Sequence, residues 1–439
     1  MPMRFTLLIV LCCLTLPLTG FSQSPKGQEK KKAGERIFVD GIVHEIQINF
    51  LQCNAWDSLL MVKKMRDSLE IRRYLQGNVV VDGKHYYSCG VRMKGESSFD
   101  FYPGKKKSFK INFGKYVKKQ RVDGLKTLNL NNAFRDPTYM REKIYLDFLR
   151  EEGLPAPRCS YANVYLNGEH LGFYVLTEEI NKGFLKRNFG NKDGAFFKGE
   201  PRATLKYLGE NSLKYQEDYR NKSNLENPYP DLKDLIRTIN QYSIDDGGKF
   251  SELDSIFNVE ACLKIYAVTS LFMNVDAYNL LYPHNYYLYS NSSTKKLEWI
   301  PYDGNYAFCA FSKKFTLAEA QDLSVFYLYN GEEMPLVRYL LGFEKYRTFY
   351  SNYITHLLEN KFTENQLVDR IDKLSIKIRK YVYQDNNKMY SNADFEQNLH
   401  STIGDEEDPG AFIPGLKSFV HHRIKAVKKE LKMNTEERN

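Results

Sequence analysis

Residues 284–305 read HNYYLYSNSSTKKLEWIPYDGN, two runs rich in aromatic residues joined by a polar segment. Such runs on either side of a short polar turn predict an antiparallel β-hairpin. With the turn centred in the polar segment, Asn285 lies beside Tyr302 and Asp303. The hairpin is therefore expected to hold an amide and a carboxylate at its open end.

A third oxygen-bearing side chain, Asp276, lies just upstream, at the end of a mostly apolar helix predicted over 258–278. Carboxylate and amide oxygens are ligands that Mg²⁺ and Mn²⁺ prefer. Sites of phosphoryl transfer combine such a metal with a separate Asp that orients the acceptor hydroxyl. The alternative is that Asn285 and Asp303 are hairpin-end residues that bond local backbone.

The chain before the hairpin is rich in strands, and the chain after residue 181 is rich in helices. Alternation and turn dipeptides predict strands at 44–50, 106–113 and 127–132, and hairpins at 78–98 and 161–180. Helical spacing predicts helices over 55–75 and 136–153, and later over 335–384 and 413–433. The pattern indicates an α+β fold, with a strand-rich lobe at 37–180 and a helix-rich lobe at 181–439 that contains the opening hairpin.

The expected helix over 136–153 has conventional end signals. Asp136 is expected to cap its amino end, with Pro137 in the first helical position and Gly153 closing its carboxyl end. Two turns elsewhere are equally explicit, Asp82-Gly83 in the first hairpin and Asn167-Gly168 in the second.

A lysine falls on an apolar face of the strand expected at 106–113. Period-two alternation puts Lys107 with Phe109, Ile111 and Phe113, while Lys110 faces the other way. A buried ammonium needs an anionic partner, and either Glu142 or nucleotide phosphates would serve. Alternatively, Lys107 lies at the open end of the strand and extends into water.

The first residues form a targeting segment. Arg4 precedes an apolar run, and a small-x-small site predicts cleavage after Ser22, so we expect residues 1–22 to be a signal peptide and 23–36 a flexible lead. Removing Arg4 with the signal lowers the formal net charge from +9 to +8, which is mild for this length. The mature chain is expected to be exported, to the periplasm, cell surface or extracellular space, without stable membrane insertion.

Cysteine use agrees with export but predicts no metal knuckle. Of seven cysteines, Cys12 and Cys13 lie in the expected signal peptide, and the remaining five show no CxxC spacing. Up to two disulfides are open to them, in pairings that the sequence does not fix.

Together these segments resemble the CotH family, the spore-coat protein H group of secreted atypical protein kinases. The resemblance runs through VDGKHYYSCGVRMKGESS, KKSFKINF, GLKTLNLNNAFRDPTYMREKI and EEGLPAPRCSYANVYLNGEHLGFYVLTEEI, and continues in HNYYLY and WIPYD. It implies an atypical kinase-like fold of two lobes that bind ATP and Mg²⁺ or Mn²⁺ between them.

The resemblance also implies roles for individual residues. Asp276 is the catalytic carboxylate, Lys107 holds nucleotide phosphates, and Glu142 orients that lysine. Glu178 lies at the lobe junction near the adenine. Further residues fall into two groups: nucleotide binding in the loop after a strand (Lys94, Ser97, Ser98) and metal binding at the hairpin base (Asn285, Asp303, Asn305).

One departure bears on activity. The family usually follows its proline with Trp-Asp-x-Asp, whereas this chain has Pro301-Tyr302-Asp303-Gly304-Asn305, so an amide replaces the second acid. The expected function is phosphoryl transfer to Ser, Thr or Tyr hydroxyls of secreted or envelope proteins. The alternative is a surface or structural binding protein with a weak or dead site. Nucleic acid is not an expected partner, because the Lys105-Lys106-Lys107 run is short and no reader motif accompanies it.

Overall fold

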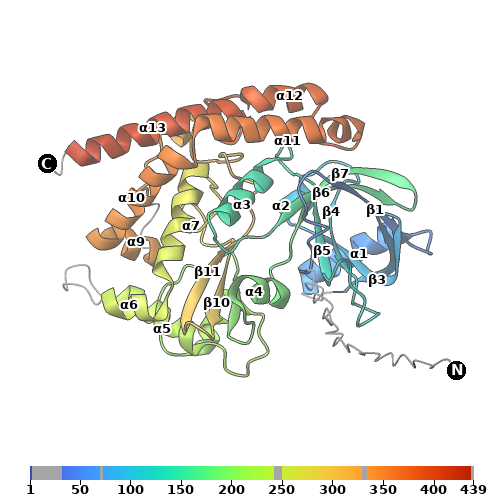
Figure 1. Cartoon of the computed structure of the whole chain (residues 1–439), viewed down its shortest axis with the longest axis horizontal. Helices are drawn as coiled ribbons and strands as arrows, with labels where there is room; N and C mark the ends of the chain where they lie inside the picture. The colour runs from blue at the N-terminus through green and yellow to red at the C-terminus, as the bar shows by residue number, and fades with distance from the viewer. Residues whose placement is uncertain (2–31, 70–72, 242–249, 329–333, 437–439) are drawn as a thin grey trace. The chain divides into compact units, whose positions relative to one another are not determined.

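Seven strands of the first half close into a β-barrel in the computed structural model (Figure 1). Around the barrel their order is β1-β2-β3-β4-β5-β7-β6. The strands are β1 (Val43–Asn49), β2 (Leu75–Val81), β3 (Lys84–Lys94), β4 (Ser108–Asn112), β5 (Thr127–Asn131), β6 (Cys159–Leu166) and β7 (Glu169–Thr177). Neighbours pair antiparallel except β1 and β6, which close the barrel in parallel with Val43 opposite Tyr161.

The structure describes residues 1, 32–69, 73–241, 250–328 and 334–436. Residues Ala33–Asn439 form one compact unit. Residues 2–22 of the expected signal peptide (1–22) and most of the expected lead lie outside the described residues. The last residues of that lead are described, and Gly34 and Arg36 donate backbone hydrogen bonds to Asp123.

Strand alternation fills the barrel interior with apolar side chains. Phe109 and Ile111 of β4 are fully buried there, as are Leu128 and Leu130 of β5. The residues between them therefore face outward. This outer face carries the polar side chains that matter below.

Two hairpin turns form as their dipeptides predict. Asp82 and Gly83 have φ of 49° and 77°, and Asn167 and Gly168 have φ of 48° and 84°. Positive φ at both central residues matches the right-handed twist of the flanking strands.

Three helices interrupt the barrel strands: α1 (Ala55–Leu69), α2 (Ser97–Asp100) and α3 (Arg141–Glu151). The predicted start of the third helix was wrong. Met140, not Asp136, is the N-cap residue of α3, because Tyr139 adopts φ of 61° and breaks the helical path between them. The Asp136 carboxylate instead accepts from the backbone N–H groups of Thr138 and Arg141, at 3.0 and 2.9 Å. Gly153, with φ of 72°, follows the helix as predicted.

The second half contains a four-stranded sheet in the order β11-β10-β8-β9, surrounded by helices (Figure 1). Its strands are β8 (Phe196–Gly199), β9 (Tyr219–Asn221), β10 (Tyr286–Asn291) and β11 (Lys296–Pro301). The opening hairpin has the predicted register, since Tyr286 pairs with Pro301 and the Tyr302 N–H donates to the Asn285 carbonyl at 2.9 Å.

The helices of this half include α4 (Lys182–Phe189), α5 (Pro230–Gln241), α6 (Phe250–Ile256), α7 (Val259–Phe272), α8 (Leu317–Asp322), α9 (Pro335–Gly342), α10 (Glu344–Asn360), α11 (Glu364–Gln384), α12 (Asn392–His400) and α13 (Leu416–Glu436). Helix α7 is buried along most of its length, in the main apolar core. The architecture is α+β. Among the described helices, none has a stretch long and apolar enough to cross a bilayer.

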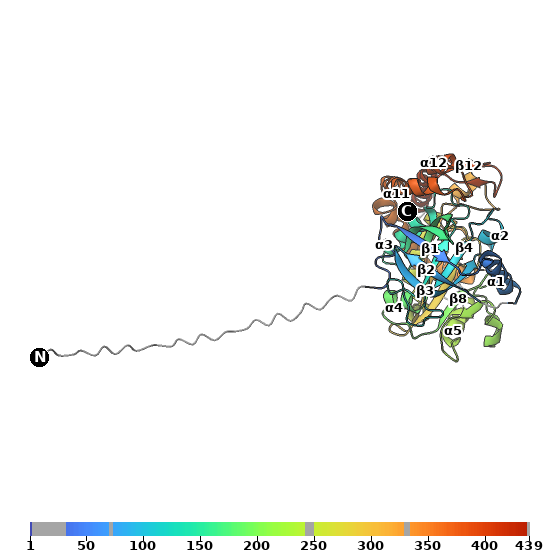
Figure 2. The same ribbon diagram turned by 90° about the vertical axis from the view of Figure 1, so that its right-hand side faces the viewer.

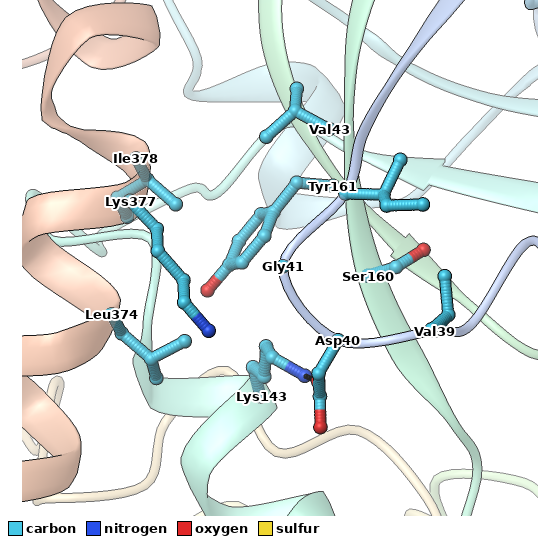
Figure 3. Close-up of a pocket in the computed structure, with 11 residues that line it drawn as sticks. Val39, Asp40, Gly41, Val43, Lys143, Ser160, Tyr161, Leu374, Lys377 and Ile378 are labelled. Carbon is cyan, nitrogen blue, oxygen red and sulfur yellow. Dashed lines mark hydrogen bonds and ion pairs between the residues drawn. The ribbon is translucent and has the colours of Figure 1, made fainter.

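Helix α11 lies against β7 of the barrel, and Figure 2 shows α11 and α12 beside the barrel in a second view. Figure 3 shows a pocket where α11 meets the segment before β1 and the start of α3. The Lys143 ammonium binds the Asp40 carboxylate there at 2.7 Å, and Lys377 reaches in from α11. None of the predicted site residues lines this pocket.

Candidate active site

The base of the β10–β11 hairpin holds Asp276 in a fixed orientation. Its Oδ1 hydrogen-bonds His284 Nε2 at 2.7 Å, and its Oδ2 accepts from Asn285 Nδ2 at 2.7 Å. Asn285 Nδ2 also donates to the Asp276 carbonyl at 2.9 Å. His284 and Asn285, just before β10, thus fix both oxygens of the Asp276 carboxylate. The Asp276 side chain remains 18% exposed.

Asp303 follows β11 directly and lies near Asp276. Burial raises the pKa of Asp303, and the negative charge of Asp276 raises it further, while Lys94 and the Asn305 backbone N–H oppose the rise. Asn274 Nδ2 fixes the local chain by donating to the Asp303 carbonyl at 3.0 Å.

Asn285 and Asp303 both adopt left-handed backbone, with φ of 59° and 61°. Asn and Asp tolerate this conformation better than other residues with a side chain beyond Cβ. The local alternative therefore explains part of their presence: each residue type suits its backbone. This local explanation does not account for the gathering of several carboxylates, because the left-handed backbone at positions 285 and 303 does not require a charged side chain.

Lys94, at the end of β3, reaches the acidic cluster through an amide relay. Its ammonium donates to Asn131 Oδ1 at 2.6 Å, and Asn131 Nδ2 donates to Glu142 Oε2 at 2.9 Å and to Thr177 Oγ1 at 3.0 Å. Burial lowers the pKa of Lys94, while the charges of Asp303 and Glu142 oppose that shift. The lysine linked to Glu142 is thus Lys94, not Lys107 as expected from the sequence.

Glu142 lies on α3 and is 4% exposed. Burial raises its pKa to about 7, with a further contribution from Asp303, although hydrogen bonds from Asn131 and Thr177 and the charge of Lys94 act in the opposite direction. The negative charge of Asp276 therefore disfavours ionisation of Asp303, and that of Asp303 disfavours ionisation of Glu142.

A second ion pair borders the cluster on the barrel side. Lys110 of β4 binds Glu179 at 2.5 Å, and Asn129 Nδ2 donates to the same carboxylate at 3.0 Å. Burial alone would raise the pKa of Glu179, but Lys110, Lys222 and these hydrogen bonds lower it to about 2.

Strand register explains why these polar residues gather. Lys94 pairs with Ser108, whose strand runs beside Asn131, and the next row on the same face contains Arg92, Lys110 and Asn129. Because alternate residues of β3, β4 and β5 fill the barrel interior, these rows must face outward. The outward face of β5 meets α3, where Asn131 contacts Glu142.

The structure does not bring Lys107 to this cluster, which corrects the expected pairing with Glu142. Strand β4 begins at Ser108, one residue later, and the Lys107 position continues the apolar interior face. Because Lys107 precedes the strand, its side chain does not enter the barrel interior. Its ammonium donates to the carbonyls of Phe99 and Tyr102 at 2.7 and 2.6 Å.

Glu178 lies at the junction after β7, but its carboxylate is occupied. Arg158 donates to it from Nε and Nη2 at 3.0 and 2.7 Å, and Arg187 Nη2 donates at 2.6 Å. Successive residues leaving a strand point to opposite sides, so Glu179 rather than Glu178 faces the candidate site.

The other predicted residues border the site without a shown role. Ser97 and Ser98 open the short helix α2 just after Lys94, and the Ser98 carbonyl accepts from Asn132 Nδ2 at 3.0 Å. Asn305 contributes its backbone N–H to Asp303.

The donor chemistry fits an open divalent-cation site. Within the described residues, no three Asp, Glu, His or Cys side chains are grouped closely enough to hold a metal on their own. However, among the described residues neither Asp303 nor Glu142 forms an ion pair, since Lys94 donates to Asn131 instead. Such negative charge is what a hard cation neutralises. Asp303 and the Oδ1 of Asn285 are the oxygens that would hold such a cation.

Sequence reasoning missed several members of the cluster. His284 immediately precedes Asn285, but only the fold shows its bond to Asp276. Lys110 was separated correctly from the apolar face of its strand, and that outward position was the available signal. Asn131, Thr177 and Glu179 become neighbours through the pairing of β5 with β7, which the local pattern does not encode.

A comparison with family profiles matches residues 91–426 to CotH kinase protein. The match covers most of the chain and includes every part of the cluster described above. The chain belongs to the CotH kinase family.

Two curated relatives of this CotH chain extend the comparison. The inner spore coat protein H of Bacillus subtilis is 26% identical over 312 residues, which cover 67% of this chain and 78% of the relative. Invasin CotH2 of Rhizopus delemar is 25% identical over 182 residues, covering 38% of this chain and 31% of the relative.

Proposed function

We propose that this chain is an ATP- and divalent-metal-dependent protein kinase with a kinase-like two-lobed fold, exported to act on Ser, Thr or Tyr hydroxyls of secreted or envelope proteins. The observation that carries the proposal is Asp276, fixed by His284 and Asn285 near the half-buried Asp303. Family membership supports the reaction class. The names of the relatives, a spore coat protein and an invasin, support a surface or exported location.

In this proposal each residue acts on the nucleotide or on the acceptor. Asp276 orients the acceptor hydroxyl and accepts its proton. Lys94 binds nucleotide phosphates, and Glu142 holds that lysine through Asn131. Asp303 and Asn285 hold Mg²⁺ or Mn²⁺, with Asn305 as a further oxygen donor. The metal supplies charge neutralisation on the phosphates.

The second candidate is a binding or structural surface protein with a weak or dead site. Asn305 favours it, since an amide stands where the family usually has a second acid. An amide oxygen can bind a cation but brings no charge to it. Asp303 remains as the acidic ligand, and for that reason we favour the kinase.

Nucleotide binding is the first test. ATP with Mg²⁺ or Mn²⁺ at about 100 times its Kd should raise the Tm by about 3 °C, because a ligand of the native state stabilises it. Asp303→Ala and Lys94→Met should remove this rise. Lys107→Met serves as the matched control and should keep it, because Lys107 binds backbone carbonyls instead. No shift with any nucleotide and metal would contradict the proposal.

Transfer of radiolabel from ATP to casein, or to the chain itself, separates an active from a dead site. Asp276→Asn keeps a side chain of the same shape and should lower transfer by about 100-fold or more, since general-base catalysis contributes at that level. The same variant should retain the ATP-dependent rise in Tm. Undiminished transfer would remove Asp276 from the catalytic role, and ATP binding by the unaltered chain without transfer would favour the second candidate.

A further inference from the structure

Arg135 presents a positive charge that the protein does not neutralise. Its guanidinium carbon lies 3.8 Å from the centre of the Phe311 ring. Among the described residues, no carboxylate forms an ion pair with it, and the acids of 405–408, near its partner Gly410, are solvent-exposed. Nη1 makes one long hydrogen bond, to the Gly410 carbonyl at 3.5 Å. A stacked arginine with free N–H donors is a typical site for a carboxylate or phosphate.

The backbone that carries Arg135 is strained and firmly held. Ala133 and Arg135 have φ of 55° and 58°, which side chains other than Asn and Asp rarely adopt. The following residue, Asp136, accepts from the buried Arg141 guanidinium at 2.6 Å, and Arg141 also donates to Asn398 Oδ1 at 2.8 Å. Strained backbone persists where the surrounding contacts fix it, and such positions concentrate at binding sites.

Phe311 connects Arg135 to the candidate active site. Its ring centre lies 5.6 Å from that of Tyr306, which follows Asp303 by three residues. The intervening loop is anchored to the end of α7, where the Cys309 N–H donates to the Met273 carbonyl at 3.0 Å. Arg135, Phe311 and Tyr306 therefore form a strip of contacting side chains that begins three residues after Asp303.

The strip lies on the Asp276 side of the site. Asn274 Nδ2 donates to the Asp303 carbonyl at 3.0 Å and the Cys309 N–H donates to the Met273 carbonyl, so residues 303–309 run beside the chain that leads from α7 to Asp276. By contrast, Lys94 reaches the site from the barrel side, where its ammonium donates to Asn131 Oδ1 at 2.6 Å. The two cations thus border different parts of the cluster, Lys94 on the side proposed for the nucleotide and Arg135 on the side where Asp276 would meet its acceptor.

We propose that Arg135, stacked on Phe311, binds an acidic side chain of the acceptor peptide. That side chain lies close to the acceptor residue, whose hydroxyl Asp276 orients. The substrate class is then a peptide with Asp, Glu or a phosphorylated residue near the acceptor. This inference rests on the proposed kinase function. The exposed acids of 405–408 would repel an acidic peptide, but salt screens repulsion between solvent-exposed charges. Salt weakens the direct contact between the peptide and the Arg135 guanidinium less.

Peptide binding tests the inference without requiring turnover. Fluorescence anisotropy would measure binding of labelled Ser peptides that differ at one position near the serine, carrying Glu, phosphoserine, Gln or Lys, with Mg²⁺ and a non-hydrolysable ATP analogue present. The Glu or phosphoserine peptide should bind about tenfold more tightly than the Gln peptide, as one charge-assisted contact predicts. Comparing Glu with phosphoserine identifies which acidic group the site prefers.

Arg135→Gln should abolish this preference, and Arg135→Lys should retain only part of it, because a lysine cannot form the planar fork. The matched control is Arg347→Gln, which alters another arginine stacked on a phenylalanine, Phe326, at 4.6 Å. That variant should bind all four peptides as the unaltered chain does.

Three results would overturn the inference: no preference for an acidic peptide, a preference that survives Arg135→Gln, or loss of the ATP-dependent rise in Tm in that variant, which would assign Arg135 to nucleotide phosphates. The rise in Tm of the unaltered chain tests the kinase proposal separately. If it is present without acidic preference, only this inference fails. If it is absent while Arg135-dependent binding persists, the peptide site stands and the kinase function fails.

Discussion

Glu178 and Glu179 are adjacent in the chain but lie in opposite environments. Two arginines occupy the Glu178 carboxylate, whereas Glu179 pairs with Lys110 beside the candidate site. The same principle separates Lys107, which lies just before β4, from Lys110 within it. The sequence thus predicted that a lysine and a glutamate border the site. It could not show which of two nearby residues reaches the site, because that depends on where each strand begins or ends. A shift of one residue exchanges the two faces.

Glu142 should make stability depend on pH. Its pKa rises from 4.5 to about 7 on folding, so the folded chain keeps a proton that the unfolded chain releases within that window. In metal-free buffer, the free energy of unfolding should therefore fall as pH rises from 4.5 to about 7, by about 3 kcal/mol at most, and then level off.

Urea unfolding at pH 5 and pH 7.5 would measure this effect. Glu142→Gln should remove that part of the pH dependence, since the amide does not titrate. Glu151→Gln is the control on the same helix, because Glu151 is 55% exposed. If the free energy of unfolding falls equally between pH 5 and pH 7.5 in the unaltered chain and in Glu142→Gln, Glu142 does not cause the fall.

At the scale of elements, local signals gave the hairpins but not their assembly. The β10–β11 register follows from its turn, and the Asp-Gly and Asn-Gly dipeptides form the turns they predict. The start of α3 was missed because Tyr139 leaves the helical region, which its residue type does not signal. The parallel pairing of β1 with β6 joins distant segments, and no local pattern specifies it.

The end of α11 is joined to the barrel by a buried ion pair. Lys106 and Asp385 are both fully buried and lie 2.5 Å apart, and the Phe173 N–H and the Tyr139 hydroxyl also donate to that carboxylate, at 2.9 and 3.2 Å. Lys106→Met would leave a buried carboxylate without its cation, which typically costs about 3–5 kcal/mol.

Urea denaturation would measure that loss. The adjacent Lys105 is the control, since its ion pair with Glu169 is 57% and 59% exposed and Lys105→Met should cost less than about 1 kcal/mol. The double variant Lys106→Met/Asp385→Asn should recover part of the loss, because the unpaired charge is then absent. Similar costs for Lys105→Met and Lys106→Met would refute a structural role for the buried pair.

At the scale of the whole molecule, the cysteines are separated by burial. The five described cysteines are all free, so the structure forms neither of the two disulfides that the sequence left open. Cys53 is exposed and the other four are buried, and burial raises the pKa of Cys89 and Cys309 to about 12. Sequence spacing excluded a metal knuckle but could not assign pairing, because pairing depends on distances set by the fold.

The chain without residues 1–22 should therefore show one fast thiol toward Ellman's reagent when native and five when unfolded. Cys53→Ser should remove the fast reaction, because buried thiols protected from ionisation are poor nucleophiles. Rapid reagent consumption by native Cys53→Ser would show that one of the four other thiols is accessible.

Closure of the barrel by β1 and β6 constrains the order in which the molecule can assemble during synthesis. Strand β1 can pair with β2 soon after both are synthesised. Its parallel partner β6 is complete only at Leu166, and β6 in turn pairs with β7, which is synthesised later still. Until then, the amino-terminal strands remain an open sheet with unsatisfied edges, which readily join other chains. A nascent chain of this protein should accordingly depend on a holding chaperone until about the first 180 residues have emerged from the ribosome.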